Sequence, residues 1–213
     1  MRKLISLLLI ISLFLSLFTA CVDKDPGTPI KPDVVTKGEV SDGYYINKDM
    51  GFKIQVPKDY YQASEEELGS MFSMREIFGD DEIEETVNYL AFFSKDIIDE
   101  MENNSHIMIA VEDADNFRYM NKDSYVENMS VAKAELYRDI KGAKVSLSNQ
   151  KSVWLDTRKF ANRSVTLNID EFEITFDMFA VVKNGYFLSI IIGAYNQEDL
   201  EYLRSIVNSL VFQ

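Results

Sequence analysis

The sequence predicts an α+β domain, with an antiparallel β-sheet of about six to eight strands and helices packed on its faces. Three observations support this class. Short runs in which apolar and polar residues alternate recur along the chain and predict strands. Helix-capping signals, each followed by apolar residues at helical spacing, lie between these runs. The elements follow one another as strand pairs separated by helices and end in a strand meander, an order that favours antiparallel pairing.

The first expected elements are a hairpin and a helix. Residues 44–47 and 51–57 form the two strands, and the second alternates apolar and polar residues until it ends at a proline. Ser64 has the position of an N-cap, and Glu67, three residues later, completes a capping box. The helix that they begin is expected to end near Gly79.

The middle of the chain predicts a further hairpin between helices. A second short helix is expected over residues 80–87. Residues 89–95 and 106–111 are apolar runs joined by an acidic, polar turn, and together they predict a pair of strands. Ser124, with a glutamate three residues later, is expected to cap a long helix that ends at Gly142.

The last third of the chain is rich in strands. The expected strands cover residues 145–148, 152–155, 160–169 and 172–183. Asn184-Gly185 is the strongest hairpin signal in the sequence, because a type I′ turn needs positive φ at both central residues. The returning strand, residues 186–194, is apolar on both faces and is expected in the middle of the sheet, covered on both sides. Asn196 is expected to cap the closing helix, residues 198–210.

Residues 1–20 have the layout of a bacterial secretion signal. Arg2 and Lys3 precede an apolar run that stops at two small residues and is shorter than a membrane-spanning helix requires. Cys21, the only cysteine, follows directly. Residues 17–21, Leu-Phe-Thr-Ala-Cys, resemble a lipobox, which implies cleavage before Cys21 and a diacylglyceryl group on its sulfur, usually with acylation of the new amine, for example by palmitate. The open alternative is an ordinary signal whose cysteine is incidental or pairs between molecules.

The rest of the chain divides into a tether and a domain. Residues 21–42 are expected to be the lipidated cysteine and a flexible tether, because they hold three of the four prolines and no aromatic residue. Val34 and Val35 could alternatively add a short edge strand. Residues 43–213 are expected to form a single globular domain, without an intramolecular disulfide because Cys21 has no cysteine to pair with.

The charge of the mature chain limits its partners. Residues 1–20 hold two basic and no acidic side chains, so the remainder has 22 − 2 = 20 Lys and Arg against 35 Asp and Glu, a formal charge of −15. Nucleic acid is therefore not expected as a partner, and anionic lipid head groups are poor ones. The domain is expected to stand off the bilayer to which its lipid is anchored.

No catalytic, cofactor-binding or metal-binding residue is assigned from the sequence. His106 is the only histidine, and a surface position at a strand entry is favoured over a catalytic triad, since no Gly-x-Ser-x-Gly occurs. There is also no Gly-rich phosphate loop. The acidic stretches 80–82 and 112–115 offer oxygens to Ca²⁺, but neither has the spacing of an EF-hand, and solvated loops are favoured.

Trp154 is the only tryptophan in the chain. With Arg158 and Arg163 nearby, it could form an exposed recognition patch. A core position is favoured, because a tryptophan in a strand is usually buried.

Several motifs of the domain resemble those of a known family. Tyr45-x-Asn47, then Gly51-Phe52-x-Ile54-x-x-Pro57-x-x-Tyr60, and the hairpin Asn184-Gly185-Tyr186 before a C-terminal helix look like secreted lipoproteins of Firmicutes. Those lipoproteins are similar in architecture to the PsbP-like fold. The resemblance implies a non-enzymatic protein that docks on membrane complexes, and it brings no catalytic residue.

Taken together, the sequence favours a lipoprotein on the outer face of the bacterial cytoplasmic membrane, anchored through Cys21. Its expected role is a non-catalytic interaction or binding module, with a surface protein, a wall polymer or a small ligand as partner and without a cofactor. The alternative is an extracytoplasmic hydrolase that depends on carboxylates. Neither the partner nor the oligomeric state follows from the sequence.

Overall fold

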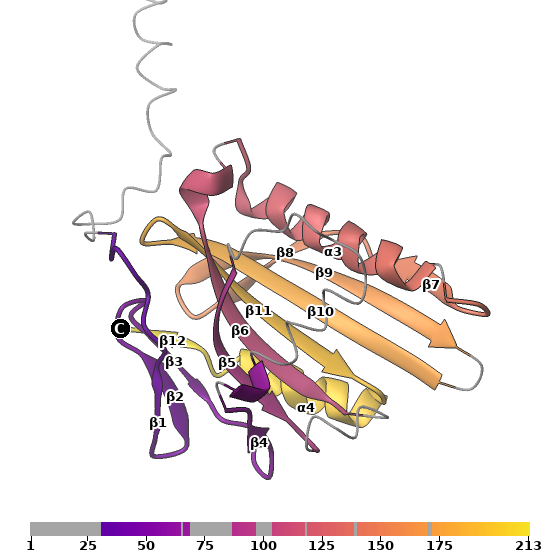
Figure 1. Cartoon of the computed structure of the whole chain (residues 1–213), viewed down its shortest axis with the longest axis horizontal. Helices are drawn as coiled ribbons and strands as arrows, with labels where there is room; N and C mark the ends of the chain where they lie inside the picture. The colour runs from indigo at the N-terminus through magenta and orange to yellow at the C-terminus, as the bar shows by residue number, and fades with distance from the viewer. Residues whose placement is uncertain are drawn as a thin grey trace, which may run out of the picture. The chain divides into compact units, whose positions relative to one another are not determined.

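A long antiparallel sheet and a shorter one organise the chain, and helices lie against the faces of the long sheet (Figure 1). The predicted α+β class is confirmed. The computed structural model describes residues 31–64, 66–68, 87–96, 104–117, 119–138, 140–169 and 172–213. The signal sequence, Cys21, most of the helix expected after Ser64 and the short helix expected over residues 80–87 lie outside these residues.

The long sheet has eight strands. In spatial order they are β4 (Tyr61–Gln62), β5 (Val87–Ser94), β6 (His106–Asp113), β11 (Tyr186–Ala194), β10 (Phe172–Lys183), β9 (Arg158–Ile169) and β7 (Lys144–Leu147), with β8 (Lys151–Leu155) also paired to β9. All of these pairs are antiparallel. The expected hairpin of residues 89–95 and 106–111 is β5 with β6.

The shorter sheet contains the first predicted hairpin. Its strands, in order, are β1 (Glu39–Ser41), β2 (Tyr44–Asn47), β3 (Phe52–Gln55) and β12 (Val211–Phe212). The sequence did not predict β1 or β12, which are only three and two residues long. The last strand pairs with β3, so the C-terminal residues close the sheet that the N-terminal residues of the domain begin.

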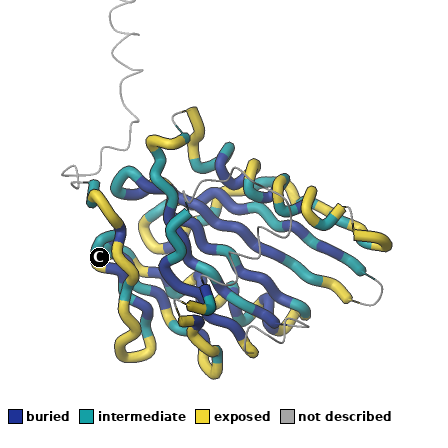
Figure 2. The backbone as a smooth tube through the Cα atoms, in the orientation of Figure 1, coloured by how far each residue is buried: buried dark blue, intermediate teal, exposed yellow. Residues whose placement is uncertain are grey.

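The central strand β11 lies between β6 and β10 and is buried on both faces, as predicted (Figure 2). One face is covered by α4 (Gln197–Val207) together with the shorter sheet. Their side chains form a continuous core that includes Phe52, Ile54, Leu188, Ile190, Leu203 and Val207. Burial of these apolar side chains on both sides of one strand is what holds the layers together.

The other face of the long sheet is covered by α3 (Lys122–Arg138), which lies over β9 and β10. Val126 and Ala134 of this helix are fully buried against the sheet. Tyr125, in its first turn, stacks on Phe187 of β11 with 4.3 Å between ring centroids. The short 3₁₀ helix η2 (Ala114–Phe117) precedes α3 and places Phe117 edge-on against the same ring.

The helix caps confirm two predictions and correct a third. The Asn196 side chain accepts a hydrogen bond from the Asp199 N–H at 2.8 Å and caps α4. Ser64 and Glu67 form the reciprocal hydrogen bonds of a capping box. The long helix, however, is capped by Asn121 instead of Ser124, since the Asn121 side chain accepts from the N–H groups of residues 123 and 124. Asparagine is at least as good an N-cap as serine, and here it lies three residues earlier.

The turn between β10 and β11 has the expected geometry. Asn184 and Gly185 have φ of 51° and 80°, the positive values that a type I′ turn requires. The Asn184 amide also donates to the Asp49 carbonyl at 3.0 Å, which ties this turn to the turn between β2 and β3. The two sheets are therefore joined at this end of β10 and β11.

The compact unit begins at Pro32, eleven residues before the expected boundary at 42/43. Val35 is buried in the core, and Thr36 bonds to the Asp49 carboxylate through both its N–H and its hydroxyl. The strand β1 follows at once. The segment before Gly43 therefore contributes to the fold, and the stretch left for a tether is residues 22–31.

Asn47 joins three parts of the shorter sheet. It is buried; its side-chain oxygen accepts from the Met50 N–H at 2.8 Å, and its amide donates to the Thr36 carbonyl at 2.8 Å. Replacing it with alanine removes both bonds and leaves the buried Met50 N–H without its hydrogen-bond acceptor.

We predict that Asn47→Ala lowers the free energy of unfolding by about 2–3 kcal/mol, measured by urea denaturation. Asn149→Ala is the matched control, because Asn149 is exposed and should change stability by less than about 0.5 kcal/mol. Equal effects of the two substitutions would contradict the structural role of Asn47.

Candidate functional site

His106 is half-buried on the long sheet, packed between aromatic rings, and so is less exposed than the surface position that the sequence favoured. Its ring stacks on Phe92 at 5.2 Å and lies 6.1 Å from Phe176. Gly193 faces it on β11, where a Cβ atom would overlap the ring. Its Nδ1 atom is 3.0 Å from the Asn104 carbonyl. These contacts describe a packed aromatic side chain.

Burial governs the protonation of this histidine. It lowers the pKa of His106 from 6.5 to about 4, with a smaller contribution in the same direction from Lys133, while the hydrogen bond to the Asn104 carbonyl acts against it. The ring is therefore neutral at pH 7. No catalytic partner for it is found among the side chains that the structure describes around it.

The acidic stretch 112–115 does not converge on one point. Glu112 accepts a hydrogen bond from the Tyr125 hydroxyl at 2.7 Å. The Asp113 carboxylate instead accepts from the backbone N–H of Asp115 at 2.9 Å, a local turn contact. Within the described ranges no group of three or more His, Cys, Asp or Glu side chains gathers in a way that could hold a metal ion. Residues 80–82 lie outside the described residues.

Two buried carboxylates serve to fix α4. The Asp199 carboxylate accepts hydrogen bonds from Lys95, Ser105 and Asn196 at 2.7–3.1 Å. Burial alone would raise the pKa of Asp199, but these hydrogen bonds hold it below its usual value. Asp177 on β10 is held by Arg204 at 2.7 Å and by the Ser164 hydroxyl. Both carboxylates are thus bound to cations and hydroxyls of neighbouring elements.

Trp154 is exposed, with 68% of its surface accessible, so the favoured core position is wrong, and of the alternative only the exposure is confirmed. The alternation of β8 explains this, because Val153 and Leu155 point to the core. The residue opposite Trp154 on β9 is Lys159. Neither arginine named in the sequence interpretation accompanies it: Arg158 lies over the Phe212 ring, and Arg163 bonds to the Ser148 carbonyl.

The exposed surface continues across the sheet from Trp154. Ala180 pairs with Ala161, and two residues further toward the same end lie Val182 and Lys159. Val182 is 42% exposed, although its partner on β11, Phe187, is fully buried. Phe187 is covered by the rings of Tyr125 and Phe117, whereas Val182, beside it in the same row of the sheet, stays exposed.

Two exposed residues, Tyr119 and Met120, lie between η2 and α3. Phe117 packs on Phe187, and the Met120 N–H donates to the Phe117 carbonyl at 2.8 Å. Met120 is exposed, and Tyr119 is fully exposed. We call the set Tyr119, Met120, Trp154, Lys159 and Val182 the Trp154 surface.

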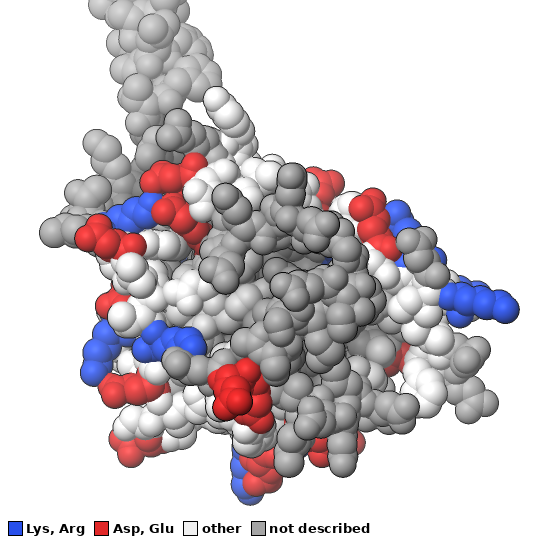
Figure 3. Space-filling view, viewed as in Figure 1, with Lys and Arg blue, Asp and Glu red and all other residues white. Residues whose placement is uncertain are grey.

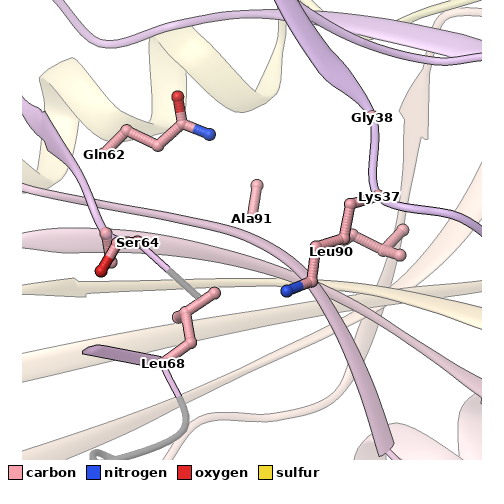
Figure 4. A pocket seen from close by; sticks show the side chains of 8 residues that line it. Lys37, Gly38, Gln62, Ser64, Leu68, Leu90 and Ala91 are labelled. Atoms are coloured by element: carbon pink, nitrogen blue, oxygen red, sulfur yellow. The ribbon is translucent and has the colours of Figure 1, made fainter. Parts of the chain in front are cut away.

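A pocket of about 350 Å³ lies elsewhere, between the start of the shorter sheet and β5 (Figure 4). Lys37 and Gly38 form one side, and the segment from Gln62 to Ser64 forms the other, with Leu90 and Ala91 of β5 as the floor. Among the described residues of the lining there is one cation, Lys37, and no carboxylate.

On the face shown in Figure 3, the described acidic and basic side chains are interspersed.

None of the described helices is long and apolar enough to cross a membrane.

Known proteins resemble this chain in architecture only. No family model and no curated protein matches it. Among solved structures, the cyanobacterial PsbP of Synechocystis sp. PCC 6803 covers 85% of this chain and all of its own, with 9% identity and a TM-score of 0.49. The Ran-binding protein Mog1p of Saccharomyces cerevisiae covers 76% of this chain and 90% of its own, with 10% identity and a TM-score of 0.40. A PsbP structure was expected from the sequence motifs; scores at this level carry no inference about activity.

The depressed pKa of His106 predicts an acid sensitivity of the fold. The unfolded chain binds a proton on this histidine below pH 6.5, whereas the folded chain resists protonation down to about pH 4. Stability should therefore fall as the pH drops from 6.5 to 4, on the order of 1–3 kcal/mol from this group. His106→Phe keeps an aromatic ring between Phe92 and Phe176 and should remove this part of the pH dependence in urea titrations. An unchanged slope in the variant would contradict the assignment.

Proposed function

We propose that the protein is a lipoprotein of the outer face of the cytoplasmic membrane, held through a lipid on Cys21, and that its domain is a non-catalytic binding module. The observation that carries the binding role is the exposed Trp154 surface. Tryptophan and tyrosine supply much of the binding energy at protein contact sites, and exposed clusters of such residues mark interaction surfaces. The signal layout of residues 1–20 before a single cysteine supports the location.

The described carboxylates favour binding over hydrolysis. A hydrolase of the carboxylate type needs two carboxyl groups facing a cleft, with one pKa raised. The two buried aspartates of the α4 face, Asp177 and Asp199, are instead held by Arg204 and Lys95. Neither lines the pocket beside β5.

The location is tested by Cys21→Ala. Each lipid CH₂ that enters the bilayer contributes about 0.8 kcal/mol, and two or three acyl chains hold a protein stably where one does not. The wild-type protein should therefore sediment with membranes, and the variant should move to the soluble fraction. Ser12→Ala, within the apolar run, is the control and should leave the protein in the membrane fraction. An unchanged distribution of Cys21→Ala would refute the anchor.

The binding role is tested by photo-crosslinking in intact cells. A photoreactive amino acid is placed at Val182, in the Trp154 surface, or at Phe172, which is 58% exposed at the other end of the same strand. We expect crosslinked adducts, to protein or to lipid, from the first position well above those from the second. Equal yields at both positions would argue against a binding role for this surface.

A further inference from the structure

We propose that the Trp154 surface binds the lipid–water interface of the bilayer that anchors the chain, so that the domain rests on the membrane by this end. The proposal rests on the proposed lipid anchor at Cys21. It concerns the partner of the same surface and makes a lipid, not a protein, its first contact.

The chain enters the domain at the end that carries the Trp154 surface. The Pro32 carbonyl accepts a hydrogen bond from the Tyr186 hydroxyl at 2.7 Å, and Tyr186 follows the turn at Asn184-Gly185 directly. Val182 lies just before that turn on β10. Figure 1 shows the start of the described domain and the β10–β11 turn at the same end of the long sheet. The point of attachment and the exposed surface therefore share one end.

The chain between the anchor and this end is short. Ten residues, 22–31, separate Cys21 from Pro32. At about 3.3–3.6 Å per residue, even a fully extended chain of this length spans at most roughly 36 Å. The far end of the sheet is about another 34 Å away, because Phe172 and Val182 are ten residues apart on β10. The end with the Trp154 surface can meet the bilayer at any extension of this segment, whereas the far end can do so only when the segment is almost fully extended.

Tethering makes weak lipid contacts sufficient. A surface linked to its binding site by a short chain meets that site at an effective concentration in the millimolar range. The modest exposed area of Trp154 and its neighbours can then hold the domain down, although the same area would not bind membranes from solution.

The residue types of this surface match the interfacial region of a bilayer. Tryptophan and tyrosine are enriched at that depth because each combines an apolar ring with a polar group. Lys159, beside Trp154, can lay its aliphatic stem against apolar groups while its amine stays in water. Val182 and Met120 supply purely apolar area.

Charge selects which lipids suit the surface. The neighbouring cations Arg158 and Lys183 both lie over the Phe212 ring, which packs on the core of the opposite face, so Lys159 is not joined to a basic patch. We therefore expect binding to bilayers with neutral head groups through apolar burial, and weaker binding as anionic lipid is added. The expectation that the domain stands off the bilayer followed from net charge alone, which does not describe this local surface.

The test uses Trp154 itself as the probe, since no other tryptophan is present. The full-length lipidated protein, purified from membranes, is reconstituted into phosphatidylcholine vesicles with and without brominated acyl chains. Compared with Cys21→Ala in buffer, its fluorescence should shift to the blue and be quenched by brominated lipid. Quenching by aqueous acrylamide should fall roughly two- to three-fold, because the indole ring leaves water for the interface.

The matched control moves the only tryptophan to the other end of the sheet. The double substitution Trp154→Phe with Phe172→Trp keeps an aromatic residue at position 154 and places the fluorophore where Phe172 is exposed. Its emission in vesicles should resemble that in buffer, with full acrylamide access and no bromine quenching.

Flotation of the same vesicles separates the anchor from the docking. If the protein floats with the vesicles but Trp154 stays fully open to acrylamide, the anchor stands and the bilayer contact is refuted. If the protein does not float, both proposals fall. If shielding of Trp154 appears only in native membranes and not in protein-free vesicles, the surface binds a membrane protein, and the lipid assignment is overturned.

Discussion

The constraint on which the structure depends is the burial of β11 on both faces. A strand whose side chains are apolar in both directions cannot lie at a solvent-exposed surface, so each face of the long sheet needs its own cover. On one face α4 and the shorter sheet enclose Leu188 and Ile190, while on the other α3 covers Phe187. The shorter sheet meets the same requirement to cover β11. Its N-terminal strands pair with one another, and the C-terminal strand β12 pairs with β3, so that together they complete the layer over the first face.

Local chemistry made much of this fold predictable. Alternation and apolar runs located the strands of the long sheet other than β4, and Asn184-Gly185 located the central hairpin, because both signals lie within a few residues. The strands β1, β4 and β12 were missed because two or three residues carry no periodicity. The domain boundary was placed too late, since the burial of Val35 depends on Asn47 and Asp49, whose hydrogen bonds to Thr36 the sequence does not display.

The candidate site was harder to predict, because exposure is set by where the covering element begins. Trp154 and Val182 lie in strands that the sequence located correctly, yet both are exposed, because the covering rings of Tyr125 and Phe117 lie over Phe187 of the neighbouring strand. The helix that carries Tyr125 begins behind the Asn121 cap, and the sequence had favoured Ser124. His106 shows the reverse error: a polar residue at a strand entry was expected in water, but it is half-buried and packs against Phe92 and Phe176.

The pairing of β12 with β3 has a practical consequence for anyone labelling this protein. Gln213 donates its N–H to the Gly51 carbonyl at 2.9 Å, beside the turn that Asn184 ties down, so both ends of the folded unit leave from one pole. A bulky fusion after Gln213 would crowd the pole that carries Trp154 and Pro32. A fluorescent group near Phe172, at the opposite pole, would report on the molecule without disturbing that contact.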